Sequence, residues 1–534
     1  MPWKRFLPFV LIAVSAVAVY SSSLRNGFVI WDDDSLVYEN PLTQEVSVKN
    51  ITGAFTSYDP ELYVPLTIMS FQMEHALFGF QPFYYHLDNL LLHIVNGMLV
   101  FLLLQRFGLK RTTAFIGALL FVVHPLNTEA AAWISARKDV LSAAFILGSL
   151  LAWRQRQWLS VLLFLLALLS KPVAIVVPAI LLLMDWYEDR KLRKDDVQVY
   201  APFLLLSILF LSIGLFGKAQ NISSLTALQT LLLAAKSIVF SLQKFLWPAP
   251  LSSIYLQTTP ITPASAEFLI PLLLGTLGAV GAFILKRWKG PLFTVGFFLL
   301  LLAPSFSNFS REGSLYYFSD RYVYLAQIAI LLLLGEILER LPRRSLWIAA
   351  IPLVFLGSIA HARSLVWKDS ETLYRDALVM NERSVTMHYN LGLLEQERGN
   401  VQAATAEYDR VLELNPLHAK TLTNMGVLAK DRGDSTTALD YFRRAMAADP
   451  LYPEARNNIG SVYMDQVKID DAIVEFQAAI ALDDSFPQAH VNLASAYGKK
   501  GMYEEALREY RIAVELEPRL LQEHPEIREA LEKF

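Results

Sequence analysis

Apolar runs that approach or reach the length of a membrane helix fill the first two thirds of the chain, and they constrain its fold more than any other feature. Of all residues, 54% are hydrophobic and 18% are charged, against about 25% charged in a soluble domain. Because backbone groups in hydrocarbon must bond within the protein, these runs predict helices. They lie near residues 6–22, 86–105, 112–123, 138–153, 157–170, 172–186, 199–217, 227–247, 267–285, 291–305, 321–338 and 345–361.

Basic residues between the runs predict the orientation of the helices, since Lys and Arg gather on the cytoplasmic side. The run at 227–247 breaks the alternation, because it carries Lys236 and Lys244 and precedes a segment without Lys or Arg. We interpret it as lying on the outer face, which leaves about 11 spans, with the N-terminus inside and the C-terminus outside. The first run is interpreted as an uncleaved membrane helix instead of a signal peptide. The basic clusters are Lys4/Arg5, Arg106/Lys110/Arg111, Arg154/Arg156, Arg190/Lys191/Arg193/Lys194, Lys286/Arg287/Lys289 and Arg340/Arg343/Arg344.

The C-terminal part repeats with a period of 34 residues, which is the tetratricopeptide pattern of paired helices. Small residues recur where two helices must approach, and an aromatic residue recurs where a gap must be filled. We predict a half repeat, four repeats over 384–518 and a capping helix. The chain is thus predicted to be all-α, with a membrane domain at 1–362 and a repeat α-solenoid at 363–534. The recurring residues are Gly392, Gly426, Gly460 and Ala494, then Tyr408, Phe442, Phe476 and Tyr510.

A column of asparagines follows the same period, on the first helix of each repeat: Asn390, Asn424, Asn458 and Asn492. One interpretation is a helix cap or a hydrogen bond between helices. The other is a ladder that binds the backbone of an extended polypeptide, because a carboxamide donates and accepts together. The column resembles the asparagine ladder in the superhelix of O-linked N-acetylglucosamine transferase. That resemblance implies that the repeats bind a protein or peptide acceptor.

Three adjacent carboxylates, Asp32, Asp33 and Asp34, end the first outer lead-in, NGFVIWDDD. They could be a solvated loop, a metal site or a general base with its neighbours. The other segments expected on the outer face bring cations, which could hold a phosphate leaving group and stabilise its charge. These cations are Arg137, Lys138, Lys171 and Arg321, with His124 and Glu129 beside them. His124 could equally be a capping residue before Pro125.

The arrangement resembles the GT-C superfamily of polytopic glycosyltransferases, and most closely the transmembrane and tetratricopeptide repeat mannosyltransferases with their prokaryotic relatives. That family transfers a sugar, typically mannose, from a polyprenyl-phosphate donor to Ser or Thr hydroxyls with inversion. The resemblance implies that Asp32 is the likelier base of the three and that Asp33 either orients it or holds an acceptor group, while Asp34 extends the usual acidic pair. The matching stretches are NGFVIWDDDSLVYENP, YVPLT, YYHLDNLLLHIVN, HPLNTEAAAWISARKDVLS, LSKP, KFLWPAPLSSIY and SDRYVYLA.

The sequence also leaves alternatives open. The acceptor could be a glycan or lipid, or the chain could be a non-catalytic scaffold that binds proteins through its repeats. We expect no cofactor and no resident metal, with a divalent metal ion at the three aspartates as the alternative. The net charge of -3 argues against a nucleic-acid partner. Short loops and a compact array favour the cytoplasmic membrane of a prokaryote, with the repeats on the periplasmic or exterior side.

Overall fold

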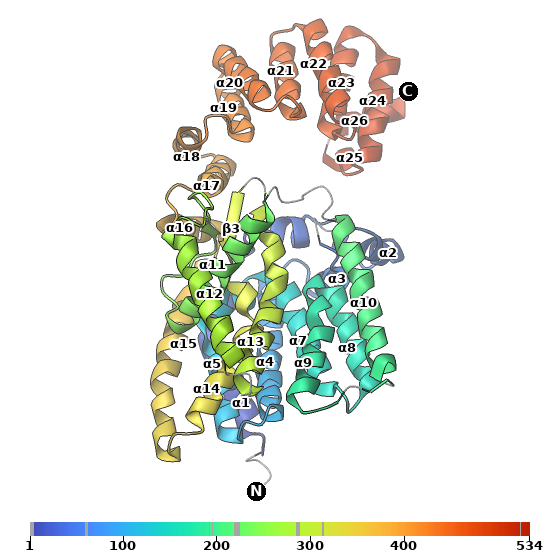
Figure 1. The fold of residues 1–534 in the computed structure, drawn as a ribbon. Coiled ribbons are helices and arrows are strands. Elements are labelled where there is room, and N and C mark those ends of the chain that lie inside the picture. Colours follow the sequence, from blue (N-terminus) through green and yellow to red (C-terminus); the bar gives the residue numbers. More distant parts are fainter. Residues whose placement is uncertain are drawn as a thin grey trace. The chain divides into compact units, whose positions relative to one another are not determined.

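The computed structural model describes residues 5–58, 62–191, 193–194, 196–217, 225–284, 289–311, 314–523 and 525–533. Lys4, Lys286 and Arg287 of the basic clusters lie outside these ranges. The chain divides into two compact units, Met1–Asn381 and Glu382–Phe534. Both units are built almost entirely of helices, which confirms the predicted all-α class (Figure 1).

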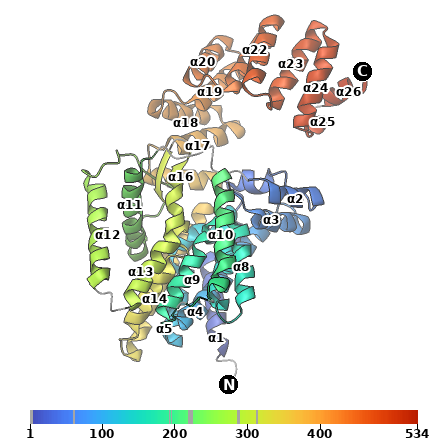
Figure 2. The same cartoon turned by 45° about the vertical axis from the view of Figure 1, so that its right-hand side comes forward.

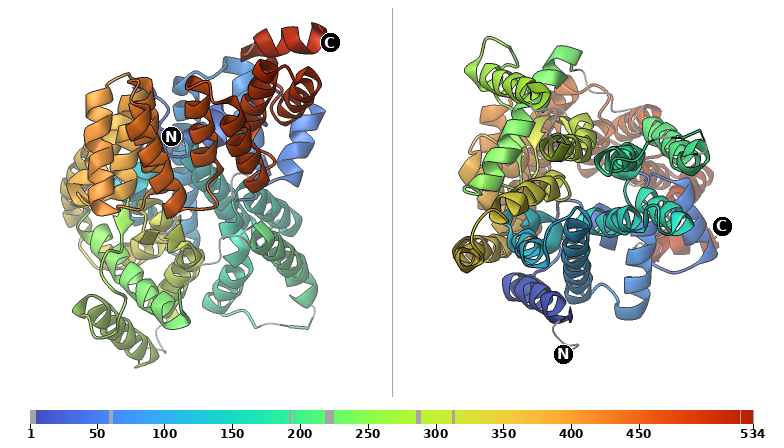
Figure 3. Two further views of the ribbon diagram at one scale, coloured as in Figure 1. Left: turned by 90° about the horizontal axis from the view of Figure 1, so that it is seen from above. Right: turned by 60° about the horizontal axis from the view of Figure 1, so that its bottom comes forward.

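The first unit is a bundle in which most long helices run side by side, as Figure 2 and the end-on view in Figure 3 show. Its helices are α1 (Leu7–Tyr20), α2 (Val48–Thr56), α3 (Pro65–Phe78), α4 (Pro82–Arg106), α5 (Arg111–Val123), α6 (Thr128–Ala132), α7 (Arg137–Ala152), α8 (Gln157–Ser170), α9 (Val177–Tyr187), α10 (Asp196–Gly217), α11 (Ala227–Leu246), α12 (Ala266–Ile284), α13 (Lys289–Leu302), α14 (Gln327–Leu338), α15 (Ala350–Ser364) and α16 (Ser370–Met380).

Among the described residues of this unit, five segments are helical, long and apolar enough to cross a bilayer alone: Leu7–Arg25, Pro82–Arg106, Asp196–Gly217, Lys289–Asn308 and Leu346–Trp367. A sixth crossing arises if the bent pair Arg111–Val123 and Pro125–Ala132 forms one broken span. Four more apolar helices are shorter: Gln157–Ser170, Pro172–Tyr187, Ala266–Gly278 and Gln327–Leu338. The chain is thus a multi-pass membrane protein. The count of about 11 spans stays a prediction, because it depends on helices that are too short to qualify alone.

The run at 227–247 forms α11, which is amphipathic and packs against α12 and a small sheet. The side chain of Thr226 caps the start of α11 by accepting a hydrogen bond from the backbone N–H of Gln229. The Gln229 side chain in turn accepts one from the backbone N–H of Thr226. The sheet has the order β1-β3-β2, from β1 (Tyr255–Leu256), β2 (Ser310–Arg311) and β3 (Ser314–Phe318), with antiparallel pairing. Lys236 lies over the Tyr317 ring of this sheet.

The break between α5 and α6 shapes the upper end of the bundle. The helix cannot continue into Pro125, because a proline inside it removes a backbone donor and clashes with the preceding turn. His124 caps the next turn, with its Nδ1 accepting from the backbone N–H of Leu126 at 3.2 Å. The chain bends by 54° here and continues through short turns into α7. After the bend, α6 contacts α4, α7 and α15.

The predicted half repeat, α16, packs on the first unit. The backbone N–H of Gly27 donates to the Lys368 carbonyl at 2.9 Å, and that of Ile30 donates to Ser370 Oγ at 2.9 Å. The hydroxyl of Tyr374 donates to the Ile30 carbonyl. The contacts therefore divide the chain after Asn381, later than the boundary that we predicted at residue 362.

The second unit contains the four predicted repeats, each a pair of helices. Tight packing explains the repeating small residues, because a Cβ at Gly426 would lie 2.4 Å from Cε1 of Phe442. Gly392 and Gly460 meet Tyr408 and Phe476 in the same way. The bounds are α17 (Val385–Glu397), α18 (Val401–Leu414), α19 (Ala419–Asp431), α20 (Ser435–Ala448), α21 (Pro453–Asp465), α22 (Ile469–Leu482), α23 (Pro487–Lys500) and α24 (Tyr503–Leu516), followed by α25 (Leu520–Glu523) and α26 (Pro525–Lys533).

Candidate functional site: a carboxylate among cations in the membrane unit

Asp33 is a buried structural clamp. Its Oδ1 accepts from the backbone N–H of Ser135 at 3.0 Å and from Ser135 Oγ at 2.6 Å. Its Oδ2 accepts from the backbone N–H of Val29 at 3.0 Å. Burial raises the pKa of Asp33 to about 7, although these hydrogen bonds favour the charged form. The carboxylate thus ties the lead-in after α1 to the turn before α7.

Asp32, the residue before Asp33, lies next to a cation. Its Oδ2 is 3.6 Å from Nζ of Lys138, and both side chains are about nine-tenths buried. The Lys138 ammonium also lies 5.5 Å from the centroid of the Trp133 ring. Asp32 is therefore an ionisable group with little access to solvent, placed by the clamp at Asp33.

Glu129 holds Arg321 in place. Its carboxylate accepts from the guanidinium of Arg321, from the Arg321 backbone N–H at 3.1 Å and from Ser319 Oγ at 3.0 Å. The guanidinium lies 5.0 Å from the Trp133 ring centroid. In the described part of the chain, Nε of Arg321 has no hydrogen-bond partner. Arg321 is thus fixed at one edge and retains a buried donor that is not used.

Lys171 completes the group of cations through Asp139. Its Nζ lies 2.5 Å from Asp139 Oδ1, while the other oxygen of Asp139 has no partner among the described residues. Burial lowers the pKa of Lys171; the charge of Asp139 opposes this effect, and the charges of Arg321 and Lys138 add to it. The effect of these two charges indicates that Lys171 lies near both Arg321 and Lys138. Asp139 was missed by the sequence analysis, although it stands beside Lys138.

Trp133 is a second residue that the sequence analysis missed. Its ring lies under both Lys138 and Arg321, and it stacks on Trp367 with the centroids 5.4 Å apart. An aromatic face attracts cations through its quadrupole, so the indole adds to the placement of both groups. A signal was present in the sequence, since Trp133 falls between two predicted site residues, Glu129 and Arg137.

The remaining predicted residues lie in other surroundings. Arg137 is almost fully buried and pairs with Glu74 at 2.9 Å and Asp88 at 3.4 Å, on α3 and α4. It also donates to the carbonyl of Tyr85 at 2.9 Å. These contacts give Arg137 a structural role in joining three helices, and they leave its predicted phosphate contact without support from the geometry.

His124 and Asp34 also differ from the central group. His124 caps a turn through Nδ1, its Nε2 lies 3.0 Å from the Phe245 carbonyl, and its ring stacks on that of Phe245. These contacts favour the capping interpretation. Asp34 is half-buried at the start of a short π-helical turn, and burial raises its pKa. Asp34 is therefore the most exposed of the three aspartates.

Asp320 is a further buried acid next to the site. It accepts a hydrogen bond from Tyr255 Oη at 3.0 Å. Burial raises the pKa of Asp320, the charge of Glu129 raises it further, and the charge of Arg363 lowers it. Across the residues that the structure describes, no group of three His, Asp or Glu side chains could hold a metal ion. The expected absence of a resident metal stays a prediction.

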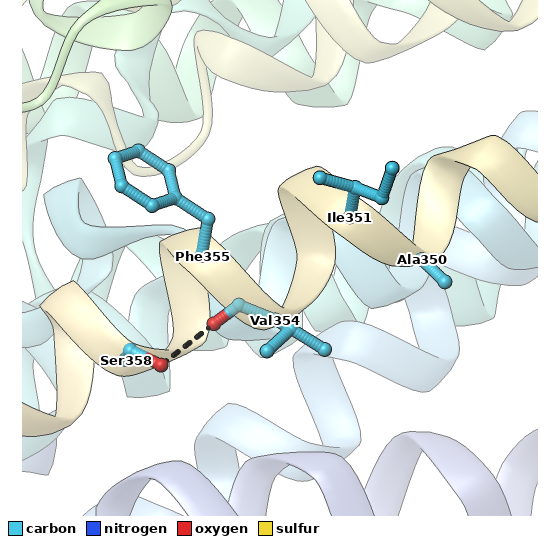
Figure 4. Close-up of a pocket in the computed structure, with 5 residues that line it drawn as sticks. All are labelled: Ala350, Ile351, Val354, Phe355 and Ser358. Atoms are coloured by element: carbon cyan, nitrogen blue, oxygen red, sulfur yellow. Dashed lines mark hydrogen bonds between the residues drawn. The ribbon is translucent and has the colours of Figure 1, made fainter.

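A pocket on the first unit has no polar chemistry. It lies along α15 and is lined by Ala350, Ile351, Val354, Phe355 and Ser358 (Figure 4). The one hydroxyl there, that of Ser358, donates to the Val354 carbonyl of its own helix at 2.9 Å. Since α15 belongs to a candidate membrane span, this surface fits contact with lipid chains.

In the repeat unit, the asparagine column is not uniform. Asn424 donates to Tyr408 Oη at 3.2 Å, and Asn492 donates to Asn457 Oδ1 at 2.8 Å, so these two link neighbouring helices. For Asn390 and Asn458, the described residues offer no hydrogen-bond partner. Asn424 and Asn492 thus fit the interpretation as hydrogen bonds between helices, whereas Asn390 and Asn458 remain available to bind a polypeptide.

These observations define a class of protein: a multi-pass membrane protein that joins a buried acid–cation site to a tetratricopeptide array. Family models for the tetratricopeptide repeat match residues 360–419, 462–501 and 487–520, which confirms the predicted repeats. Among solved structures, the crystal structure of MamA protein matches 29% of this chain and 85% of its own, with a TM-score of 0.24 and 22% identity.

Curated relatives are more informative. A protein O-mannosyl-transferase of Caenorhabditis elegans is 25% identical over 442 residues, covering 76% of this chain and 62% of its own length. Another of Mus musculus is 22% identical over 487 residues, covering 77% of this chain and 51% of its own length. The predicted resemblance to the transmembrane and tetratricopeptide repeat mannosyltransferases is thereby confirmed. The chain spans between half and two thirds of the length of these relatives.

Proposed function

We propose that the chain is an inverting protein O-mannosyltransferase. It takes mannose from a polyprenyl-phosphate donor and transfers it to Ser or Thr hydroxyls of exported proteins, on the outer face of a prokaryotic cytoplasmic membrane. The observation that carries this proposal is the position of Asp32, which is 8% exposed and lies beside Lys138 with Arg321 and Lys171 near it. Relatives named as protein O-mannosyl-transferases support the choice of sugar and acceptor.

The reaction needs one base and a site for a departing phosphate. Asp32 accepts the proton of the acceptor hydroxyl as the oxygen forms a bond to the anomeric carbon. The bond from that carbon to the phosphate oxygen breaks, and the electron pair leaves on the phosphate. Lys138, Lys171 and Arg321 stabilise the negative charge that grows there. Attack and departure on opposite faces of the sugar invert its configuration.

Two acids act as positioning residues. Asp33 holds the turn that carries Asp32, through its hydrogen bonds to Val29 and Ser135. Glu129 holds the guanidinium and the backbone of Arg321. Burying such pairs is costly, and polar groups inside membrane proteins persist mainly where they serve a site. Neither acid needs to touch the sugar.

A lipid-linked donor agrees with this placement. Nucleotide sugars are made in the cytoplasm, so an enzyme on the outer face must receive a sugar that has crossed the membrane on a lipid. The polar segments contain no Gly-rich nucleotide loop of the GxGxxG type. The apolar helices around the site provide a surface for the polyprenyl chain.

The repeats are proposed to bind the acceptor polypeptide through the asparagine column. Replacing Asn390, Asn424, Asn458 and Asn492 by Ala together should lower transfer to protein without affecting the reaction at Asp32. If the acceptor is instead a glycan or a lipid, the same change should leave transfer unaltered. If the chain is a scaffold, no variant will show transfer at all.

The experiment uses the full chain in nanodiscs with radiolabelled polyprenyl-phosphate mannose and a pool of exported host proteins. Wild type should label protein, and the label should be released by β-elimination. Asp32→Asn should lower the rate by about 10²- to 10⁴-fold, the range of a general base. Asp34→Asn is the matched control, since it removes a neighbouring acid that is more exposed, and it should retain most of the activity.

Label in a lipid or glycan fraction would support the transferase activity and contradict the proposal that the acceptor is a protein. Absence of transfer from mannose, glucose or other lipid-linked donors would instead favour the scaffold. Equal loss in Asp32→Asn and Asp34→Asn would contradict the assignment of the base.

A further inference from the structure

Hydrogen bonds between the first helices of neighbouring repeats follow one spacing. Asn424 donates to Tyr389 Oη, and Asn492 donates to Asn457 Oδ1; both pairs are 35 residues apart. These pairs join α19 to α17 and α23 to α21, so the same side of each first helix faces the preceding one. We call each such pair a rung. The array has room for a rung between α21 and α19 at the same spacing.

This middle rung is not made. The same spacing from Asn458 leads to Thr423, yet neither side chain has a hydrogen-bond partner among the described residues. Thr423 is 4% exposed and its Oγ1 is buried. A buried hydroxyl without a partner destabilises the fold, so its persistence calls for a reason. Two closed rungs thus flank one open rung at the centre of the array.

A carboxylate with an unused oxygen accompanies the open rung. Glu454 stands four residues before Asn458 on α21, which puts the two on the same face of the helix. Its Oε2 is buried and has no partner in the described residues. Burial raises the pKa of both Tyr389 and Tyr452, and the charge of Glu454 raises it further, so the carboxylate lies near both rings.

Cations close by are engaged elsewhere or stay in solvent. Arg456 pairs with Glu475 at 3.1 Å, and Lys430 donates to Ser461 Oγ at 3.0 Å. Lys420 is exposed and makes no ion pair with Glu454 in the part of the chain that the structure describes. The open rung therefore presents a negative charge that no described cation of the chain neutralises at ion-pair distance.

We propose that Thr423, Asn458 and Glu454 form a subsite for a basic side chain of a polypeptide that lies along the first helices. A guanidinium or ammonium carries donors only, and the subsite offers three acceptors: a hydroxyl, a carboxamide oxygen and a carboxylate. An anionic or phosphorylated segment would be repelled. This proposal rests on the proposed acceptor role of the repeats and adds to it a preference for one residue type.

Binding is measured first without any sugar donor, using the full chain in nanodiscs. The probes are pools of degenerate 12-residue peptides with the central position fixed as arginine, as citrulline or as glutamate. Citrulline keeps the shape of arginine and removes its charge. We expect wild type to bind the arginine pool on the order of 10-fold more tightly than the citrulline pool, the lower end of the range for one hydrogen bond to a charged group.

Variants then assign the preference to the open rung. Glu454→Gln should abolish the difference between arginine and citrulline, and Thr423→Val with Asn458→Ala should reduce it. Glu515→Gln is the matched control, because it removes the same charge from an exposed position on α24. Glu454→Lys should reverse the preference toward the glutamate pool. Thermal unfolding of each variant separates a folding defect from a binding defect.

The subsite is overturned if wild type binds the arginine and citrulline pools equally, or if Glu515→Gln lowers the preference as much as Glu454→Gln does. Mannose transfer is then measured separately on the same preparations. A preference for arginine without transfer would support the proposed subsite and contradict the proposed transferase activity. Transfer to protein without a preference for arginine would support the transferase activity and contradict the subsite.

Discussion

The indole ring of Trp133 stacks on that of Trp367, with the centroids 5.4 Å apart and the planes 22° from parallel. Trp133 carries the cations Lys138 and Arg321 over its ring, and Trp367 lies directly before α16. The half repeat is therefore packed into the wall of the site. Trp367 and α16, which the sequence predicts to be a half repeat, thus pack next to the candidate site of the membrane unit.

The first prediction concerns this stack. Trp367→Ala removes a ring that is 1% exposed, so we expect a loss of about 3–5 kcal/mol in the free energy of unfolding. Transfer should fall as well, since Trp133 loses its support. Trp158→Ala is the control, because its side chain is 76% exposed at the start of α8, and it should change little. Thermal unfolding in detergent checks both variants, and equal shifts would contradict the stack's importance.

The second prediction is a pH dependence that originates at Asp33. Burial raises the pKa of this carboxyl from 3.8 to about 7, so the folded state binds its proton more tightly than the unfolded state. The contribution to stability is then present below about pH 4 and is lost as the pH rises toward about 7. The slope is at most about 1.4 kcal/mol per pH unit.

Asp33→Asn isolates the contribution of Asp33 to the pH dependence of stability, since other carboxylates titrate over the same range. The variant should be less stable at low pH, because an amide nitrogen cannot accept the hydrogen bond from Val29. Its stability should also fall less steeply than that of wild type between pH 5 and pH 7. Denaturant unfolding at several pH values measures the two slopes, and identical slopes would show that Asp33 does not titrate in this range.

The third prediction tests the positioning of Arg321. Glu129→Gln keeps the size of the side chain but removes the charge that holds the guanidinium. A misplaced phosphate ligand should lower kcat/KM on the order of 10- to 100-fold. Arg321→Lys should lower it similarly, because an ammonium lacks the fork that spans Glu129 and a phosphate. In the double variant the losses should be less than additive; fully additive losses would mean that the two residues act independently.

The fourth prediction concerns the repeats. Gly426→Ala places a methyl group 2.4 Å from Cε1 of Phe442, so we expect destabilisation by about 1–3 kcal/mol. Gly498→Ala is the matched control: no atom lies within 4 Å of its added Cβ, and Ala favours a helix over Gly by about 1 kcal/mol. Circular dichroism during thermal unfolding distinguishes them. Equal effects would show that the packing of Phe442 can relax freely.

Patterns with a strict period were predictable from the sequence. The 16-residue spacing of a small residue and an aromatic residue, as at Gly392 and Tyr408, occurs in all four repeats, because each repeat has the same local packing. The apolar runs predicted helices for the same reason, since a backbone in lipid has few alternatives. Candidate site residues were predicted where charges interrupt apolar segments, as at Asp32, Lys138 and Arg321, and their roles stay predictions. The contacts divide the chain after Asn381, whereas the composition changes near residue 362.

Composition and periodicity alone determined that this chain forms membrane helices followed by paired repeat helices. Which charges work together was decided only by the tertiary structure. Asp32 and Asp33 are neighbours in sequence, yet Asp32 faces Lys138, whereas both oxygens of Asp33 accept hydrogen bonds from Ser135 and Val29. Likewise, Arg137 and Lys138 are adjacent, but helical geometry turns them toward different partners. A sequence specifies the type of each side chain, whereas the direction in which it points depends on how distant segments pack around it.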